Sequence, residues 1–166
     1  MFGQNINNMN RSQLSLLRQK IGVVFQEFRL LDHMNVIDNI ALPLRAAGIS
    51  ASDQGEDVME LVRWVGLEDR AGAFPPQLSA GEKQRAAIAR AVINSPELIL
   101  ADEPTGNIDP EMGGRILRLL IELNRLGKTV LLATHDMGLI RTAKSLVEAH
   151  VLRLADGRLS QSAAAL

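Results

Sequence analysis

Two neighbouring carboxylates, Asp102 and Glu103, directly follow the apolar run at 98–101. Parallel α/β sheets bind their ligands at the carboxyl ends of strands, which is where this pattern places the pair. Mg²⁺ takes hard oxygen ligands and keeps several waters, so Asp102 alone is enough to hold one beside phosphates. Glu103 is then placed to orient or deprotonate an attacking water. Taken in isolation, the pair is better explained as an acidic loop after a core strand, because this pattern is common.

A second candidate is the turn made by Ser79, Ala80, Gly81 and Glu82, which opens a predicted helix. Ser79 and Glu82 have the spacing of a capping box. Free N–H groups and the helix dipole favour an anion at such an N-terminus, and Gly81 lets a phosphate approach the backbone. An ordinary helix cap needs no ligand, so this turn by itself does not define a site.

Three more polar residues stand at the ends of predicted elements. Gln26 follows a short apolar run and offers its amide to a metal-held water or a phosphate, and His135 ends another run and can bond a phosphate. Asp109 precedes Pro110 and caps a helix. Each residue alone favours a loop or capping role. Their order along the chain, together with the turn and the carboxylate pair, is specific and very unlikely to arise by chance.

The elements that must position these residues alternate between strand and helix. Such alternation predicts an α/β domain with a mostly parallel sheet, whose strands at 97–101 and 129–134 are buried. An extended connector is expected at 74–77, a tight turn at Asp156 and Gly157, and a frayed end from residue 160. The predicted helices are 11–19, 35–47 with a break or kink at Pro43, 53–65, 79–93 and 109–127, and the predicted strands are 21–25, 97–101, 129–134 and a last set within 146–154.

Composition narrows the classes of protein that remain. The 166 residues suit one domain, and 46% hydrophobic with 22% charged residues suits a packed core. A net charge of −1 gives no general attraction to nucleic acid or anionic lipid, and the lack of cysteine excludes disulfides and cysteine metal sites. No apolar run is long enough to span a bilayer and no signal peptide is visible, so we expect any membrane link to come through a partner.

The ordered series resembles the ATP-binding subunits of ABC transporters over essentially the whole chain. The resemblance implies a partial P-loop NTPase fold of the ABC ATPase type, with residues 27–95 forming approximately the helical signature subdomain and the rest an incomplete core. It implies ATP and Mg²⁺ as cofactors, with Asp102 and Gln26 at the metal and Glu103 and His135 as catalytic residues. The motif matches are Gln26 (Q-loop), 78–84 (signature), 98–102 (Walker B), Glu103 (catalytic glutamate), 107–109 (D-loop) and His135 (switch histidine). In the signature, Ala80 and Glu82 replace the commoner Gly and Gln. The nucleotide-binding residues that the resemblance implies are Gln26, Ser79, Ala80, Gly81, Glu82 and Asp109.

Residues 101–109 look like the group of lipoprotein-release, macrolide-export and cell-division ATPases, and 28–34 look most like its FtsE-type cell-division branch. This resemblance implies an FtsX-like transmembrane subunit that docks around residues 27–50 and a head-to-tail dimer with another ATPase subunit. It also implies a peripheral, membrane-associated position on the cytoplasmic face of a bacterial inner membrane. Neither nucleic acid binding nor direct insertion into the membrane is expected.

One departure from the family is large. The P-loop of the family, Gly-x-x-x-x-Gly-Lys-Ser/Thr, aligns upstream of residue 1. The only Gly-Lys-Thr in the chain, at 127–129, is not a P-loop, because Glu122 stands where the first glycine belongs and because the segment precedes a strand, whereas a P-loop follows one. We therefore expect an N-terminally truncated chain that is inactive alone and poorly soluble, since the P-loop strand belongs inside the sheet. The alternatives are a catalytically dead regulatory or interaction module and the ATPase subunit of a lipoprotein-release or macrolide-type exporter. A DNA-repair or chromosome ATPase is a weaker alternative, because residues 27–77 leave no room for the long coiled coil of that class.

Overall fold

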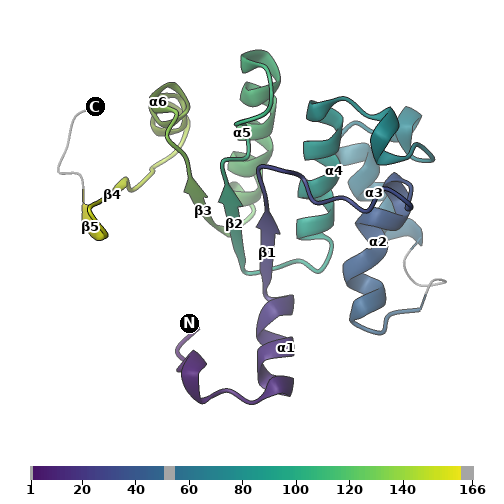
Figure 1. The fold of residues 1–166 in the computed structure, drawn as a ribbon, viewed down its shortest axis with the longest axis horizontal. Coiled ribbons are helices and arrows are strands. Elements are labelled where there is room, and N and C mark those ends of the chain that lie inside the picture. Colours follow the sequence, from purple (N-terminus) through teal and green to yellow (C-terminus); the bar gives the residue numbers. More distant parts are fainter. Residues whose placement is uncertain (1, 51–54, 162–166) are drawn as a thin grey trace.

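The computed structural model describes residues 2–50 and 55–161, which fold as an α/β domain (Figure 1). Strands and helices alternate through the first part of the chain, as the sequence predicts. The helices are α1 (Arg11–Gln19), α2 (Val36–Ala46), α3 (Gly55–Trp64), α4 (Ala80–Val92), α5 (Pro110–Arg125) and α6 (Met137–Leu146), with 3₁₀ turns η1 (Ile6–Asn8), η3 (Glu68–Arg70) and η4 (Pro75–Gln77). The strands are β1 (Ile21–Val24), β2 (Leu98–Asp102), β3 (Thr129–Ala133), β4 (Leu152–Ala155) and β5 (Arg158–Gln161).

The main sheet has the order β1-β2-β3, and both strand pairs are parallel. Val24 lies beside Ala101, which lies beside Leu132, so the three strands end at the same edge. This arrangement confirms the predicted mostly parallel sheet and brings the residues that follow each strand together. The remaining strands, β4 and β5, form a separate antiparallel hairpin, whose turn residues Asp156 and Gly157 have φ angles of 49° and 71°. Two positive φ angles are typical of a type I′ hairpin turn.

Helix α4 joins two hydrophobic clusters. One cluster packs α4 and α5 against a single face of the sheet, and the other packs α4 against α2 and α3. The shared helix places Ile88 in the first cluster and Ala86 and Ala89 in the second, all fully buried. In Figure 1, α4 accordingly stands between the sheet and the α2–α3 pair. Because α4 begins with the Ser79 turn, the candidate anion site is anchored to the core of the domain.

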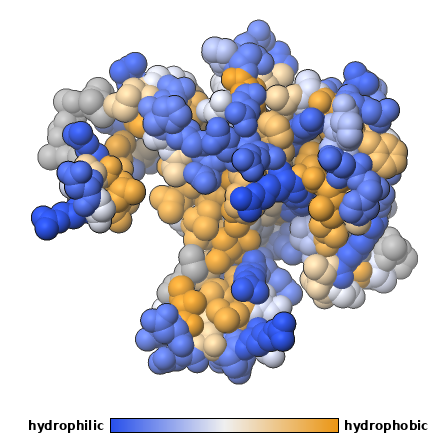
Figure 2. Space-filling model, viewed as in Figure 1, coloured by the Kyte–Doolittle hydropathy of each residue, from blue (hydrophilic) through white to orange (hydrophobic). Residues whose placement is uncertain are grey.

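The opposite face of the sheet is open in the described part of the chain, and this corrects the expectation that the strands are buried. Side chains along β3 alternate between exposed and half-buried, and Leu131 is 54% exposed. Figure 2 shows hydrophobic side chains gathered over this part of the sheet. The physical reason is that no described helix packs on this face and no described strand pairs with the outer edge of β3.

Several local predictions need smaller corrections. Pro43 does not break α2, which continues to Ala46. The segment at 74–77 is a 3₁₀ turn whose N–H at Phe74 donates to the Gln77 side chain, and is not an extended connector. The last strands do not start near residue 146, because Asp136 caps helix α6 and that helix occupies the chain up to Leu146. The predicted helix positions 53–54 and most of the predicted frayed end, 162–166, lie outside the described residues, whereas the first two positions of that end, Ser160 and Gln161, belong to β5.

Candidate functional site

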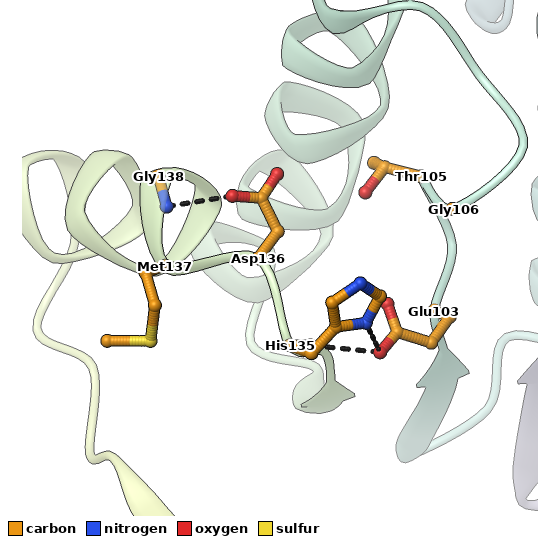
Figure 3. Close-up of a pocket in the computed structure, with 7 residues that line it drawn as sticks. All are labelled: Glu103, Thr105, Gly106, His135, Asp136, Met137 and Gly138. Atoms are coloured by element: carbon orange, nitrogen blue, oxygen red, sulfur yellow. Dashed lines mark hydrogen bonds and ion pairs between the residues drawn. The ribbon is translucent and has the colours of Figure 1, made fainter.

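The side chain of Glu103 is held by the residues that follow β3. Its Oε1 atom lies 2.6 Å from Nδ1 of His135 and accepts the backbone N–H of His135 at 2.9 Å. Its Oε2 atom accepts the hydroxyl of Thr134 at 3.1 Å. Figure 3 shows the imidazole and the carboxylate facing each other across the ends of the two strands. Glu103 itself has a φ of 43°, a left-handed conformation that is uncommon outside glycine, and these three contacts help to hold it there.

The two groups of this contact shift each other's titration. Burial raises the pKa of Glu103, but the hydrogen bonds from the side chain and backbone of His135 and from Thr134 outweigh it, so the pKa lies below its ordinary value. The hydrogen bond to Glu103 and its negative charge raise the pKa of His135. The carboxylate is therefore ionised at neutral pH and is available as a hydrogen-bond acceptor, which is the form that orients or deprotonates a water.

An open cavity of about 480 Å³ lies beside this pair (Figure 3). Asp136 stands at its wall and its Oδ1 accepts the N–H groups of Gly138 and Leu139 at 2.8 Å and 3.1 Å. The N-terminus of α6 is thus already capped by a carboxylate, and the chemistry of the cavity comes from Glu103 and His135. The lining residues are Glu103, Thr105, Gly106, His135, Asp136, Met137 and Gly138.

Gln26 and Asp102 lie at the same edge of the sheet. Asp102 is the exposed last residue of β2, and Gln26 is exposed two positions beyond β1. The carbonyl of Gln26 accepts the side-chain amide of Asn107 at 3.1 Å. A Cβ on Gly106 would lie 2.8 Å from Nε2 of Gln26, so the glutamine amide rests against the loop that follows Glu103.

The Ser79 turn has the predicted capping box. The hydroxyl of Ser79 accepts the N–H of Glu82 at 3.3 Å, while Oε2 of Glu82 accepts the N–H and the hydroxyl of Ser79, each at 2.8 Å. The backbone hydrogen bond from Ser79 is the main reason that the pKa of Glu82 lies below its ordinary value. Ser79 is exposed and Ala80 half-buried, so the tip of the turn faces solvent.

Gly81 has a packing role that sequence reasoning did not anticipate. It is buried, and a Cβ at this position would lie 2.5 Å from Cγ of Met112 in the first turn of α5. The absence of a side chain therefore lets α4 approach α5. Asp109 caps α5 as predicted, with Oδ1 accepting the N–H of Met112 at 2.9 Å.

Two residues of α4 connect this helix to the loops that follow β2 and β1, in roles that the sequence pattern does not predict. Gln84 is fully buried and its Nε2 donates to the carbonyl of Pro104 at 2.8 Å, which ties the signature helix to the residue after Glu103. Arg90 donates from Nη1 to the carbonyl of Arg29 at 2.6 Å and from Nη2 to that of Phe28 at 2.8 Å. Burial lowers the pKa of Arg90, in keeping with its enclosed position beside the loop after Gln26.

The donor set fits Mg²⁺ only together with a phosphate ligand. No group of three or more histidine or acidic side chains capable of holding a metal occurs in the part of the chain that the structure describes. Mg²⁺ is usually bound through one or two carboxylates plus substrate phosphates, and Asp102 with the Gln26 amide supplies that kind of partial set.

The parallel sheet, with an Asp–Glu pair at its carboxyl edge that faces a histidine and is tied to a capped helix, agrees with a partial domain of the ABC ATPase fold. A family model described as ABC transporter matches residues 2–106, and the chain belongs to that family. It is 47% identical over 139 residues to the cell division ATP-binding protein FtsE of Haemophilus influenzae, covering 84% of this chain and 64% of that protein.

Other relatives extend this comparison. The chain is 44% identical over 165 residues to the methionine import ATP-binding protein MetN 3 of Pseudomonas fluorescens, covering 99% of this chain and 50% of that protein. A solved dimeric structure of the ATP-binding cassette MJ0796, in a post-hydrolysis state bound to ADP and Pi, superimposes with a TM-score of 0.82 at 34% identity. That match covers 99% of this chain and 72% of the other.

The chain thus spans about half to two thirds of the length of the two curated relatives, at 50% and 64%. Within the described ranges, none of the helices combines the length and the apolar character needed to cross a bilayer.

Proposed function

We propose that this chain is part of an FtsE-like ATP-binding subunit that hydrolyses ATP in cell division. The observation that carries the proposal is the contact between Glu103 and His135 at the ends of β2 and β3, with Gln26 following the neighbouring strand β1. The similarity to FtsE favours the cell-division branch of the family, and the MJ0796 cassette supports ATP as the ligand.

Each residue of the site has a role in this proposal. Glu103, ionised and held by three hydrogen bonds, orients the attacking water and accepts its proton as a general base. His135 is 87% exposed on its side chain, so its free ring nitrogen is accessible to a γ-phosphate. Asp102 and Gln26 would hold Mg²⁺, which supplies charge neutralisation for the phosphates when bound. Gln84 keeps the signature helix in register with this edge of the sheet.

We infer that the active form is a head-to-tail dimer of ATPase subunits. The exposed turn at Ser79 and Ala80 would face the phosphates bound by the other subunit, with residues 27–95 as its helical subdomain. These 166 residues contain no Gly-x-x-x-x-Gly-Lys-Ser/Thr sequence, so the chain by itself would not hydrolyse ATP. An FtsX-like transmembrane subunit docking around residues 27–50 would hold the protein at the cytoplasmic face of a bacterial inner membrane.

A complementation experiment tests the dimer and the site together. An intact FtsE is inactivated in its own signature serine and mixed with this chain, and Mg-ATP turnover is measured. We expect turnover to be restored by the chain and not by its Ser79→Asp variant. Aspartate caps a helix as well as serine does, so the helix is kept while a negative charge faces the phosphate. The proposal would be contradicted if turnover were restored by both the chain and its Ser79→Asp variant, or by neither of them.

A second candidate is the ATP-binding subunit of an importer, which the similarity to MetN 3 favours. Copurification with an FtsX-type or a methionine-importer transmembrane subunit separates the two functions, because each subunit would select its own ATPase. If this chain copurified with the methionine-importer subunit and not with the FtsX-type subunit, the importer function would be favoured over the role in cell division.

A further inference from the structure

A second cavity, of about 280 Å³, lies between α3, α4 and α5 and shares no lining residue with the cavity at Glu103. Trp64 at the end of α3 is one of its lining residues. Most of the other long side chains around it are basic, and none of the lining residues is acidic. The arginines are Arg63 from α3, Arg85 from α4, and Arg115 and Arg118 from α5.

The positive charge of this arginine pocket is poorly balanced. Within the described residues, Arg115 alone among the four forms an ion pair, with Glu111 one turn earlier on α5 at 3.1 Å. The Glu111 side chain is 83% exposed, so this pair is largely screened by solvent. Arg63, Arg85 and Arg118 have no carboxylate partner in the described ranges.

Arg85 is the most constrained of the four. Its Nη1 donates to Sδ of Met112 at 3.1 Å, a weak acceptor, and its Nε is buried without a hydrogen-bond partner among the described residues. Burial lowers the pKa of Arg85; the charge of Glu82 opposes this, and the charge of Arg115 adds to it. Arg85 and Arg115 line the same cavity from different helices, so their positive charges repel each other, and a bound anion would relieve that repulsion.

We propose that the arginine pocket binds a compact, multiply charged oxyanion of the phosphate class. Guanidinium forks match phosphate oxygens in pairs, and groups from three helices can meet several oxygens at once. A volume of about 280 Å³ is slightly below the usual size of pockets for drug-sized ligands, which suits a small polyphosphate. This site is separate from the one at Glu103 and does not rest on the proposed function.

Trp64 gives a direct readout, because it is the only tryptophan in the chain. Tripolyphosphate is titrated into the 166-residue chain that stays in the supernatant after centrifugation at high dilution, while tryptophan fluorescence is recorded. Binding is measured in parallel by equilibrium dialysis of radiolabelled tripolyphosphate. We expect saturable binding that weakens as sodium chloride is raised. The double variant Arg115→Gln/Arg118→Gln should bind at least about tenfold more weakly, since it loses two charge-assisted partners.

The matched control is Arg141→Gln, which removes an exposed arginine on α6 outside the pocket and should leave binding unchanged. Far-ultraviolet circular dichroism confirms that each variant is folded. The proposal is overturned if the wild-type chain shows no saturable binding in dialysis. Equal loss of affinity in Arg141→Gln and the double variant would also overturn it, because the effect would then reflect net charge alone.

Discussion

Oε1 of Glu103 lies 2.6 Å from Nδ1 of His135, so the residues that follow two neighbouring parallel strands meet through their side chains. The backbone N–H of His135 and the hydroxyl of Thr134 bind the same carboxylate. The orientation of Glu103 thus depends on the residues that follow the neighbouring strand β3, and a substitution there should change the orientation and the pKa of this carboxylate.

His135→Ala should raise the pKa of Glu103 toward its ordinary value. The substitution removes the side-chain hydrogen bond and the charge of the imidazole, which act against the effect of burial. A carbon-detected NMR titration of the glutamate carboxyl groups measures this pKa. His150→Ala, which removes an exposed histidine elsewhere, is the control. An unchanged pKa of Glu103 in His135→Ala would show that the contact does not control its ionisation.

The same contact predicts how stability depends on pH. His135 has a raised pKa in the folded chain, so its contribution is complete below the unfolded value of about 6.5 and is lost as pH rises through the folded value. Glu103 has a lowered pKa, so its contribution is present above about 4.5 and is lost as pH falls through the folded value.

Urea unfolding of the wild type and His135→Ala at several pH values measures this dependence. The difference in unfolding free energy should be largest between about pH 4.5 and 6.5, where both contributions are complete, and should shrink in alkaline solution. The effect should be small, because the His135 side chain is 87% exposed. A difference that grows as the pH is raised would have the wrong sign for this account.

Gly81→Ala should destabilise the chain by about 1–3 kcal/mol, because the new methyl group would meet Met112 in a packed contact between α4 and α5. Met112→Ala should recover part of this loss in the double variant. Gly114→Ala is the control, since its Cβ would meet no atom closer than 3.8 Å in the middle of a helix. If Gly81→Ala lowered the free energy of unfolding equally in the wild type and in the Met112→Ala background, the contact with Met112 would not be the cause.

Local signals in the sequence predicted the elements of the site better than the contacts between them. Ser79 with Glu82 and Asp109 with Pro110 act within one helical turn, and the structure contains both caps as expected. Gln84 and Arg90 contact carbonyl groups 20 and 61–62 positions away, which helical periodicity does not specify.

The exposure of Leu131 also escaped prediction, for a different reason. An apolar run indicates a strand, but whether both faces are covered depends on which other elements pack there, and the described residues cover one face only. In the same way, Asp136 carries the signal of a helix cap, but no helix is predicted after it and the last strands are predicted from about residue 146, where α6 ends.

The open face of the sheet predicts that this chain aggregates when it is made alone. Leu131→Lys should increase the fraction of protein that stays in the supernatant, because it places a charge on an exposed apolar edge strand. Leu132→Lys is the matched control, since Leu132 packs against the core and its replacement should lower solubility further. Centrifugation and size-exclusion chromatography measure both. A wild-type chain that is already a stable, monodisperse monomer would contradict this prediction.

Mg-ATP turnover by a fusion that supplies a P-loop tests the central claim most directly. The segment of the Haemophilus influenzae FtsE that precedes the matched region is fused to residue 1, and its turnover is compared with that of Glu103→Gln in the same fusion. We predict turnover by the fusion and a decrease of about a hundredfold or more in the variant, since a general base is removed while the shape is kept. A fusion that turns over ATP equally well with Glu103→Gln would contradict the assignment of Glu103 as the catalytic residue.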